Sequence, residues 1–409
     1  MQKLSEKRLL ICEEALLDFK GHFYSWIKAI RAINKDAGVE VLVAGNKDVK
    51  SEIRKEFDVL PVYTHNNWSG IYDYRHAWRR YFSVFMHNRR ILKQTRSVLR
   101  QTGPVDCIIL TAVRIHHLLA WKKLCNEGLG KDFNRVVLFV LTSEAIYDES
   151  YKNFHFKRSS ALMKFILKSF KREVANGQVI LAGDSHITCK EYESLAGVPF
   201  KVFPSPAAGL QAAAEPLGAA PSRPDTTPCF VILGVSVIDK GIDLLQEAIL
   251  LLLGDDPKLK ARFIIQWSTP TIDYNGNPVP ISDILRGAPQ VELIEHVLDE
   301  DSYREYMQDA DFIVLPYRRK VYFNRISGVA VEAACAGIPM IVTENTWLSW
   351  AMTEFGAGVT VRDGDATDLA DKIKLCLAER VTLSATAQER KTVARKSNST
   401  EHYLQILWN

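Results

Sequence analysis

Short apolar runs alternate with longer amphipathic stretches through the first half of the chain. The apolar runs are rich in Val, Ile and Leu, and they predict strands at Arg8–Cys12, Val39–Ala44, Val105–Ala112, Arg135–Thr142 and Gln178–Ala182. Stretches of helical length, such as Phe23–Ile33 and His116–Asn126, lie between them. Continuous apolar strands that alternate with helices are typical of a parallel sheet covered on both faces. Residues 1–206 are therefore predicted to form one α/β domain.

The same alternation returns in the second half of the chain. Strands are predicted at Cys229–Gly234, Phe263–Trp267, Val291–Ile294, Phe312–Leu315 and Met340–Thr343. Helices are predicted at Ile242–Leu253, Ser302–Met307, Val329–Ala336 and Ala366–Ala378. The intervening residues 207–227 are rich in Pro, Ala and Gly, which favours a linker over a folded core. The predicted fold class is α/β, with two doubly wound, Rossmann-like domains, 1–206 and 228–395, that face each other across a cleft.

Length and composition limit the possible classes of protein. A chain of 409 residues suits about two domains. Its apolar runs are far shorter than the roughly 20 residues that a membrane-spanning helix needs. The N-terminal residues turn acidic where a signal peptide would be most apolar, and the seven cysteines show no close metal-ligand spacing. We expect a cytoplasmic protein whose cysteines are small buried side chains, without a structural zinc site.

Positive charge is concentrated in the first domain. Residues 207–409 hold 19 Lys and Arg against 27 Asp and Glu, a net charge of −8, which leaves +12 on residues 1–206. Much of this excess lies in segments 74–105 and 152–172, which interleave Arg and Lys with aromatic and aliphatic residues. The first of these segments has no acidic residue.

Two interpretations of the basic segments are open. Basic amphipathic helices bind anionic lipid headgroups, which would attach the protein peripherally to the inner face of a membrane or favour an acidic, lipid-linked ligand. Ordinary helices bury the same apolar residues against a sheet and leave the charges in water. A nucleic-acid partner is disfavoured, because no known nucleic-acid-binding module accompanies the charge.

The loop after the first strand of the second domain is a candidate anion site. Parallel α/β sheets bind ligands beyond the carboxyl ends of their strands. This loop begins at Gly234 and delivers Lys240 and Gly241 to the start of a helix. A lysine there adds a positive charge to a helix N-terminus that already favours anions.

A second candidate lies in the loop after Phe312–Leu315. Ser327, Gly328 and Val329 open a helix there, and a glycine lets a ligand approach the free amide groups closely. A diphosphate fits such a site, with Arg325 or the run at 318–320 as its counter-charge. Glu332 lies about one turn into the helix, where its carboxylate is placed to accept the hydroxyls of a ribose.

Four stretches resemble the C-terminal half of a nucleotide-sugar glycosyltransferase of the large group 1, retaining family, which has the GT-B fold. They are, in order, LGVSVIDKGIDLLQEA, ADFIVLPY, SGVAVEAACAGIPMIVT and FGAGVTVRDGDATDLADKI. The resemblance is specific over residues 228–380 and only architectural before them. It implies that the second domain holds the sugar nucleotide, that the first holds the acceptor, and that a C-terminal helix at about 396–409 crosses back to the first domain.

The resemblance also implies roles for single residues. Lys240 matches the family's phosphate-binding lysine, and Glu332 matches the glutamate that binds ribose. The amides of Ser327, Gly328 and Val329 match its phosphate loop. Gly21 and His22 resemble the glycine loop of its acceptor domain.

Three positions depart from the family pattern. The family usually has two glutamates spaced eight residues apart, and Asn324 stands in place of the first. Val235 stands where an arginine usually precedes the lysine. Ser143 and Glu144 follow a predicted strand at the point where many relatives have a histidine. The side of the site that would face the donor sugar is therefore the least well defined.

The expected activity is metal-independent transfer, with retention, of a sugar from a UDP- or GDP-sugar to an acceptor hydroxyl, without a cofactor. The acceptor would be a glycan or lipid-linked molecule in the synthesis of cell-surface polysaccharide, lipopolysaccharide or another glycoconjugate. Candidate catalytic residues are His22, His116, Glu144 and Asn324.

Two alternatives stay open: a catalytically silent nucleotide-sugar-binding subunit, which the departures at Asn324 and Val235 would suit, and a nucleotide-sugar epimerase of the same architecture. A dinucleotide oxidoreductase is disfavoured, since no GxGxxG follows any predicted strand.

Overall fold

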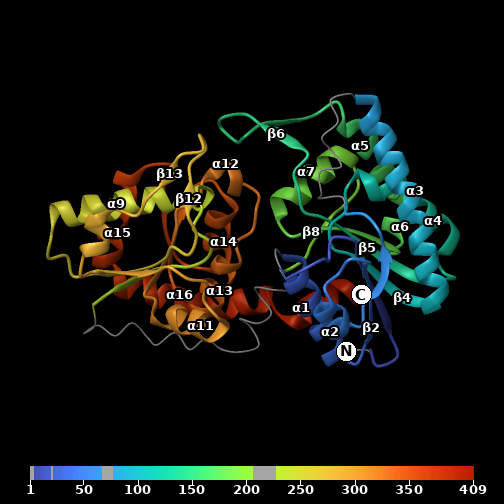
Figure 1. Cartoon of the computed structure of the whole chain (residues 1–409), viewed down its shortest axis with the longest axis horizontal. Helices are drawn as coiled ribbons and strands as arrows, with labels where there is room; N and C mark the ends of the chain where they lie inside the picture. Colours follow the sequence, from blue (N-terminus) through green and yellow to red (C-terminus); the bar gives the residue numbers. More distant parts are fainter. Residues whose placement is uncertain (1–3, 20–21, 67–76, 206–226) are drawn as a thin grey trace. The chain divides into compact units, whose positions relative to one another are not determined.

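The computed structural model describes residues 4–19, 22–66, 77–205 and 227–409 (Figure 1). The chain divides into two compact units, each with its own parallel sheet. Unit 1 comprises Met1–Ala207 together with Tyr403–Asn409, and unit 2 comprises Ala208–His402. Residues 207–226 of the predicted linker lie outside the described residues.

Unit 1 is built on a seven-stranded sheet with the order β3-β2-β1-β4-β5-β8-β9. Its strands all run parallel, and the central ones are buried because helices cover both faces. The strands are β1 (Arg8–Glu13), β2 (Glu40–Asn46), β3 (Leu60–Tyr63), β4 (Val105–Leu110), β5 (Phe133–Val140), β8 (Val179–Gly183) and β9 (Lys201–Val202). A separate hairpin pairs β6 (Ala145–Tyr147) with β7 (Phe154–Phe156).

The helices of unit 1 connect these strands and enclose a core around Trp121, Phe133 and Phe170. They are α1 (His22–Asp36), α2 (Ser51–Phe57), α3 (Ala77–Thr102), α4 (Ile115–Gly128), α5 (Ser160–Ser169), α6 (Lys171–Ala175) and α7 (His186–Ala196). The end of the chain returns to this unit. The indole Nε1 of Trp408 donates to Asn34 Oδ1 at 3.0 Å, and Arg135 Nη1 donates to the carbonyl of Leu407 at 2.8 Å.

Unit 2 has a six-stranded parallel sheet with the order β14-β11-β10-β15-β16-β17. Its strands are β10 (Cys229–Ile232), β11 (Arg262–Gln266), β14 (Val291–Ile294), β15 (Phe312–Leu315), β16 (Met340–Thr343) and β17 (Gly358–Val361), with a small hairpin of β12 (Thr271–Ile272) and β13 (Pro278–Val279). The buried rings of Phe230, Phe263 and Phe312 stack across neighbouring strands, with centroids 5.0 and 5.5 Å apart.

The helices of unit 2 follow its strands in turn. They are a 3₁₀ turn η1 (Ile238–Lys240), α9 (Ile242–Asp255), α10 (Asp283–Gly287), α11 (Glu300–Asp309), α12 (Arg319–Tyr322), α13 (Gly328–Ala336), α14 (Trp347–Phe355), α15 (Ala366–Ala378) and α16 (Arg380–Ser397). The start of α15 shows how the sequence sets a boundary, because Asp365 accepts a hydrogen bond from the amide of Asp368 at 2.8 Å and caps the helix.

The predicted α/β class with two doubly wound, Rossmann-like sheets is confirmed. All ten strands predicted for the two sheets are present, each within about two residues of the expected bounds. The C-terminal helix expected at about 396–409 is present but shorter, and its residues Tyr403–Asn409 belong to unit 1. Helix α16 ends at Ser397, and a new helix, α17 (Thr400–Trp408), begins after a break at Asn398 and Ser399.

Two properties of the side chains and helices bear on the expected class of protein. All seven cysteines, each within the described part of the chain, are buried and free, as predicted. In the described ranges, no helix is both long enough and apolar enough to cross a membrane.

Candidate functional site

Each sheet has a point where the chain changes its direction of winding, and ligands of doubly wound folds bind there. In unit 2 this point lies between the neighbouring strands β10 and β15, which are the first and fourth strands of the six-stranded sheet in chain order. The two loops that follow them, with the start of α13, contain all the predicted donor-binding residues except Gly21. These residues therefore lie together at the winding point of this sheet, and their role in binding a donor stays a prediction.

The loop after β10 is shaped by two glycines in left-handed backbone conformations. Gly234 has φ +106°, and Gly241 has φ +68°. A Cβ on Gly241 would lie 2.2 Å from the carbonyl oxygen of Pro316, so only glycine fits between the two loops. The backbone amide of Arg318 donates to the carbonyl of Asp239 at 2.9 Å and joins the loops a second time.

Lys240 lies at the centre of this edge, and no described carboxylate pairs with it. Its Nζ lies 5.5 Å from the centroid of the buried Tyr317 ring, and a Cβ on Gly234 would come within 2.6 Å of the same nitrogen. Burial lowers the pKa of Lys240. Within the described residues Lys240 forms no ion pair, so a bound anion would neutralise its buried positive charge.

Helix α13 offers the second half of an anion site. Ser327 is its N-cap and accepts from the amide of Ala330 at 3.4 Å. The amides of Gly328 and Val329 are the first two of the helix and have no intrahelical acceptor, so they suit the oxygens of a ligand.

The cations near this helix differ in their availability. Arg318 is paired with Asp243 at 2.5 Å, and Arg319 is paired with Asp363 at 3.8 Å. Both guanidinium groups therefore already have carboxylate partners, which makes them less available as counter-charges, whereas Lys320 of the same run is exposed. Arg325 is exposed in the loop before α13 and is the better candidate.

Glu332 is positioned by a tyrosine that the sequence did not reveal. The hydroxyl of Tyr303, on α11, donates to Glu332 Oε2. Burial raises the pKa of Glu332, and the tyrosine hydrogen bond opposes that rise. The second carboxylate oxygen is left for another donor, such as a ligand hydroxyl. Asn324 lies in the loop just before α13, in a partly buried position.

Two polar side chains join the loop after β10 to the loops of the neighbouring strands. Gln266 accepts from the amide of Gly234 at 2.7 Å and donates to the carbonyl of His296 at 3.4 Å. Ser236 lies 3.2 Å from the hydroxyl of Thr269. Beside them is a pocket of about 320 Å³ whose walls include Trp267, Pro280, Arg286 and Glu295.

The site residues predicted in unit 1 are only partly brought together: Gly21 was expected to bind the donor, and His22, His116 and Glu144 were expected to be catalytic. Gly21 lies outside the described residues, and His22 is the first residue of α1, where the side chain is likewise outside the description. His116, in the first turn of α4, and Glu144, after β5, both line a pocket of about 390 Å³. Glu144 accepts from the hydroxyl of Ser160 at 2.9 Å.

Burial and neighbouring positive charge define the chemistry of this pocket. Burial, together with the nearby His117, lowers the pKa of His116 to about 3. The other walls come from α3, α4 and α5 and from Thr142 to Ser143: Tyr81, Val84, Arg114, Ile115, Ser159, Leu162 and Met163. The pocket thus has both apolar and polar walls, and the apolar part is the larger.

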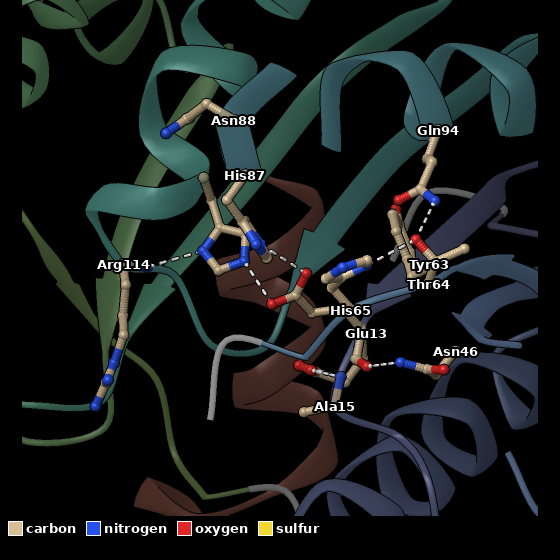
Figure 2. Close-up of polar contacts among 12 residues, drawn as sticks. Glu13, Ala15, Asn46, Tyr63, Thr64, His65, His87, Asn88, Gln94 and Arg114 are labelled. Atoms are coloured by element: carbon tan, nitrogen blue, oxygen red, sulfur yellow. Dashed lines mark hydrogen bonds and ion pairs between the residues drawn. The ribbon is translucent and has the colours of Figure 1, made fainter. Parts of the chain in front are cut away.

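A buried carboxylate–histidine network occupies the winding point of unit 1, between β1 and β4 (Figure 2). Glu14, which follows β1, contacts His87 Nε2 at 2.9 Å and His117 Nε2 at 3.3 Å. Burial alone would raise the pKa of Glu14, but the two imidazoles outweigh it and lower that pKa to about 2. At the neighbouring position, burial raises the pKa of Glu13 to about 7, although the Thr111 hydroxyl donates to it.

The proton positions distinguish this network from a metal site. One possible ligand atom from each of Glu14, His87 and His117 lies within 4.8 Å of the others. The amide of Arg114, however, donates to His117 Nδ1 at 3.1 Å, so Nδ1 is an acceptor and the ring N–H is Nε2, which faces Glu14. A metal-bound histidine usually donates from its other ring nitrogen instead. The arrangement is that of a hydrogen-bond network centred on Glu14.

Sequence reasoning missed this network and the tyrosine on α11. A signal existed for the network, because the consecutive acids Glu13 and Glu14 follow a buried strand at the winding point. Nothing local pointed to His87 and His117, which come from two separate helices.

Comparison with known proteins agrees with the geometry of unit 2. Residues 227–379 match the family model of the glycosyl transferases group 1. A stretch of 159 residues is 30% identical to D-inositol 3-phosphate glycosyltransferase from Geodermatophilus obscurus, covering 36% of this chain and 33% of that protein. The match therefore spans about one third of the curated relative's length.

Solved structures resemble the whole chain. Sucrose-phosphate synthase from Thermosynechococcus elongatus has a TM-score of 0.59 at 14% identity, with 98% of this chain and 97% of that chain covered. UDP-GlcNAc 2-epimerase from Neisseria meningitidis, bound to UDP-GlcNAc, has a TM-score of 0.53 at 14% identity, with 95% and 97% covered. At such identities the likeness shows a shared fold, and it extends over both units.

Proposed function

We propose that this chain, a group 1 glycosyltransferase of the GT-B fold by its family match and its architecture, transfers a sugar from a nucleotide-sugar donor to an acceptor hydroxyl. The observation that carries the proposal is the pairing of Lys240 with the N-terminus of α13 at one edge of one sheet. Two independent anion-binding features on neighbouring loops suit the two phosphates of a nucleoside diphosphate.

The rest of the donor follows from the positions around that edge. The diphosphate contacts Lys240 and the amides of Gly328 and Val329, with Arg325 nearby. Glu332, whose orientation Tyr303 fixes, accepts the ribose hydroxyls. The pocket beside Trp267 and Glu295 takes the base, and a uracil or guanine nucleotide is the expected class.

The proposed chemistry is stabilisation of charge on the leaving group. The bond between the sugar's anomeric carbon and the diphosphate oxygen breaks, and a bond from the acceptor oxygen to that carbon forms. The acceptor's proton leaves with the diphosphate or through a side chain. Lys240 and the helix N-terminus hold the negative charge that develops, which lowers the barrier. This positive charge comes from the protein itself, so we propose a metal-independent reaction with retention of configuration.

We assign the acceptor to unit 1, where the pocket lined by His116 and Glu144 combines polar and apolar walls. A glycan or lipid-linked acceptor of cell-surface polysaccharide or glycoconjugate synthesis fits such a lining. His116 stays neutral at ordinary pH because its pKa is about 3, so it is suited to a hydrogen bond with an acceptor hydroxyl.

The test is a donor assay with UDP- and GDP-sugars, followed by proton NMR of the anomeric signals. We expect slow hydrolysis or transfer with retention of the anomeric configuration, and loss of at least 100-fold in rate in Lys240→Ala and in Glu332→Ala. Lys258→Ala, an exposed lysine of the same unit, is the matched control and should keep full activity.

Other results would select an alternative. Conversion of the donor sugar to its epimer without an acceptor would replace transfer by epimerisation. Nucleotide binding without any turnover of donor would favour the silent binding subunit. An inverted product would contradict retention while leaving transfer intact.

A further inference from the structure

One face of α3 exposes a continuous row of aromatic side chains. Trp78, Tyr81, Phe82 and Phe85 are 65%, 52%, 60% and 57% exposed. Their spacing of three, four and seven residues places them on the same side of the helix. Single exposed apolar residues are ordinary on protein surfaces, but four large aromatics in contact range along one helix are not. We call these four residues the α3 aromatic stripe.

The stripe is distinct from the face by which α3 packs onto unit 1. Val84, His87, Ile91 and Val98 are at most 5% exposed and form the buried side of the helix. The core of the unit is therefore complete without the stripe. In the described part of segment 74–105, residues 77–105, these four aromatics are surface, not core. The buried residues of the helix agree with the second interpretation, and lipid binding stays a prediction. The first residues of the segment, 74–76, lie outside the described residues.

Positive charge surrounds the stripe. Helix α3 has no acidic residue from Ala77 to Thr102, and Arg79, Arg89 and Lys93 are exposed on it. Helix α5 continues the pattern, with Phe165 73% exposed between the exposed Lys164 and Lys168. The two helices lie in the same part of unit 1 (Figure 1). Both line the 390 Å³ pocket, α3 with Tyr81 and Val84 and α5 with Leu162 and Met163.

We propose that this α3–α5 face docks on an anionic lipid bilayer. Aromatic side chains gain by entering the boundary between headgroups and acyl chains, and the flanking cations gain from the negative surface. A second copy of the chain fits less well, because a symmetric contact would bring two acid-free, basic helices together. The docked face carries the rim of the pocket, so a membrane-embedded amphiphile could present its polar head there.

The docking stands independently of the donor chemistry, and only the amphiphilic acceptor rests on the proposed function. Vesicle binding is measured without any nucleotide sugar, so its failure would leave the transferase proposal untouched. Loss of donor turnover in a protein that still binds vesicles would overturn the transferase proposal and leave the docking surface.

The experiment is co-sedimentation of the full chain with vesicles of phosphatidylcholine alone and with phosphatidylglycerol added. We expect binding to the anionic vesicles that weakens as salt screens the charges. The variant Trp78→Ser/Phe82→Ser/Phe85→Ser should abolish binding. Its control, Ile284→Ser/Val381→Ser, removes comparably exposed apolar residues of unit 2 and should bind normally.

A charge series separates electrostatic from apolar binding. Lys164→Gln/Lys168→Gln should weaken partitioning by roughly fivefold per lysine. The matched control, Lys258→Gln/Lys260→Gln, changes two exposed lysines of unit 2 and should have no effect. Each substituted position is exposed, so the melting temperature of every variant should stay close to that of the wild type, which guards against misfolding as the cause.

Three results would overturn the proposal. Equal binding to neutral and anionic vesicles would remove the role of charge. Unchanged binding by the triple serine variant would place the contact elsewhere. A wild-type dimer that the triple serine variant converts to a monomer, without vesicle binding, would identify the face as an interface between copies.

Discussion

The two units share a strand order at their winding points but carry opposite charge there. In unit 2, Lys240 and the N-terminus of α13 face outward from β10 and β15 with no carboxylate paired to the lysine among the described residues. In unit 1, the equivalent position beyond β1 and β4 holds Glu13 and Glu14, both buried. The fold fixes where a site can form, and the residues at that edge fix what it binds.

The two edges also differ in how many of their polar groups already have partners within the protein. Both oxygens of Glu14 already face imidazole nitrogens, and the adjoining cavity of about 20 Å³ has room for about one water. The edge of unit 1 is thus a filled structural network that ties α3 and α4 to β1. The edge of unit 2 keeps unsatisfied donors, as a binding site requires.

The largest expected effect is on the filled network. Glu14→Ala leaves the ring N–H groups of His87 and His117 buried without their acceptor, and breaking such a buried arrangement costs about 3–5 kcal/mol. Urea unfolding should show this loss. Glu127→Ala, which removes an exposed partner of Arg96, should cost at most about 1 kcal/mol. A loss as small as the control's would mean that Glu14 does not hold unit 1 together.

The next effect is the response of the same region to acid. The folded pKa of His116, about 3, lies below the ordinary value of 6.5, so the unfolded chain binds the proton more readily. Above pH 6.5 this group therefore does not lower the free energy of unfolding. Below pH 6.5 it lowers that free energy by about 1.4 kcal/mol per pH unit as the pH drops towards 3. Glu14 adds a loss below about pH 4.5, since its folded pKa is about 2.

The acid response is checked by urea unfolding of wild type and His116→Gln between pH 8 and pH 4. Subtracting the two curves removes the shared contribution of Glu14. The wild type should lose stability faster than the variant below pH 6.5. Parallel curves would show that His116 titrates alike in the folded and unfolded chain.

Two glycine substitutions in unit 2 test whether nucleotide binding depends on the position of Lys240. Gly234→Ala places a Cβ where the Lys240 ammonium lies, so it should displace the lysine and weaken nucleotide binding by at least about tenfold. Gly276→Ala is the matched control, because Gly276 also has positive φ, at +88°, but no atom within 4 Å of the added Cβ. Calorimetric titration with UDP and GDP should separate the two variants. Equal affinities would show that Lys240 does not need its present position.

The smallest expected effect is a gain. Val235 is 55% exposed in the loop before Lys240, and Val235→Arg would add a guanidinium near the proposed diphosphate. Exposed charge pairs contribute up to about 1 kcal/mol, so we expect affinity to rise by about two- to fivefold at low salt. Val297→Arg adds the same charge at another exposed position of unit 2 and should change little. A weaker affinity in Val235→Arg would show that the valine faces something other than phosphate.

The sheets could be predicted from sequence because their central strands are buried on both sides and therefore read as continuous apolar runs. Three of the four edge strands, β3, β9 and β17, were missed, whereas the edge strand β14 was predicted. Leu60–Tyr63 is short and contains proline, and Lys201–Val202 is exposed. Helix α16 is mostly polar, so it lacks the apolar periodicity that marked the other helices.

The position of the candidate anion site in unit 2 could also be predicted, because its features are local. Gly234 to Gly241 and Ser327 to Glu332 each lie within one loop and the start of one helix. The contact between Tyr303 and Glu332 joins residues 29 apart, and the network of Glu14, His87 and His117 joins a loop to two helices. Such contacts depend on how elements pack, which the residue pattern of one element does not contain.

The most direct test of the central claim is a thermal-shift measurement of the full chain with UDP, GDP, ADP and CMP, repeated with Lys240→Ala and Glu332→Ala. A nucleotide present at ~100 times its dissociation constant adds ~2.7 kcal/mol of apparent stability. We predict a clear rise in melting temperature with one family of nucleoside diphosphates, and its loss in both variants. No rise with any nucleotide, or a rise that both variants retain, would contradict a donor site at the winding point of unit 2.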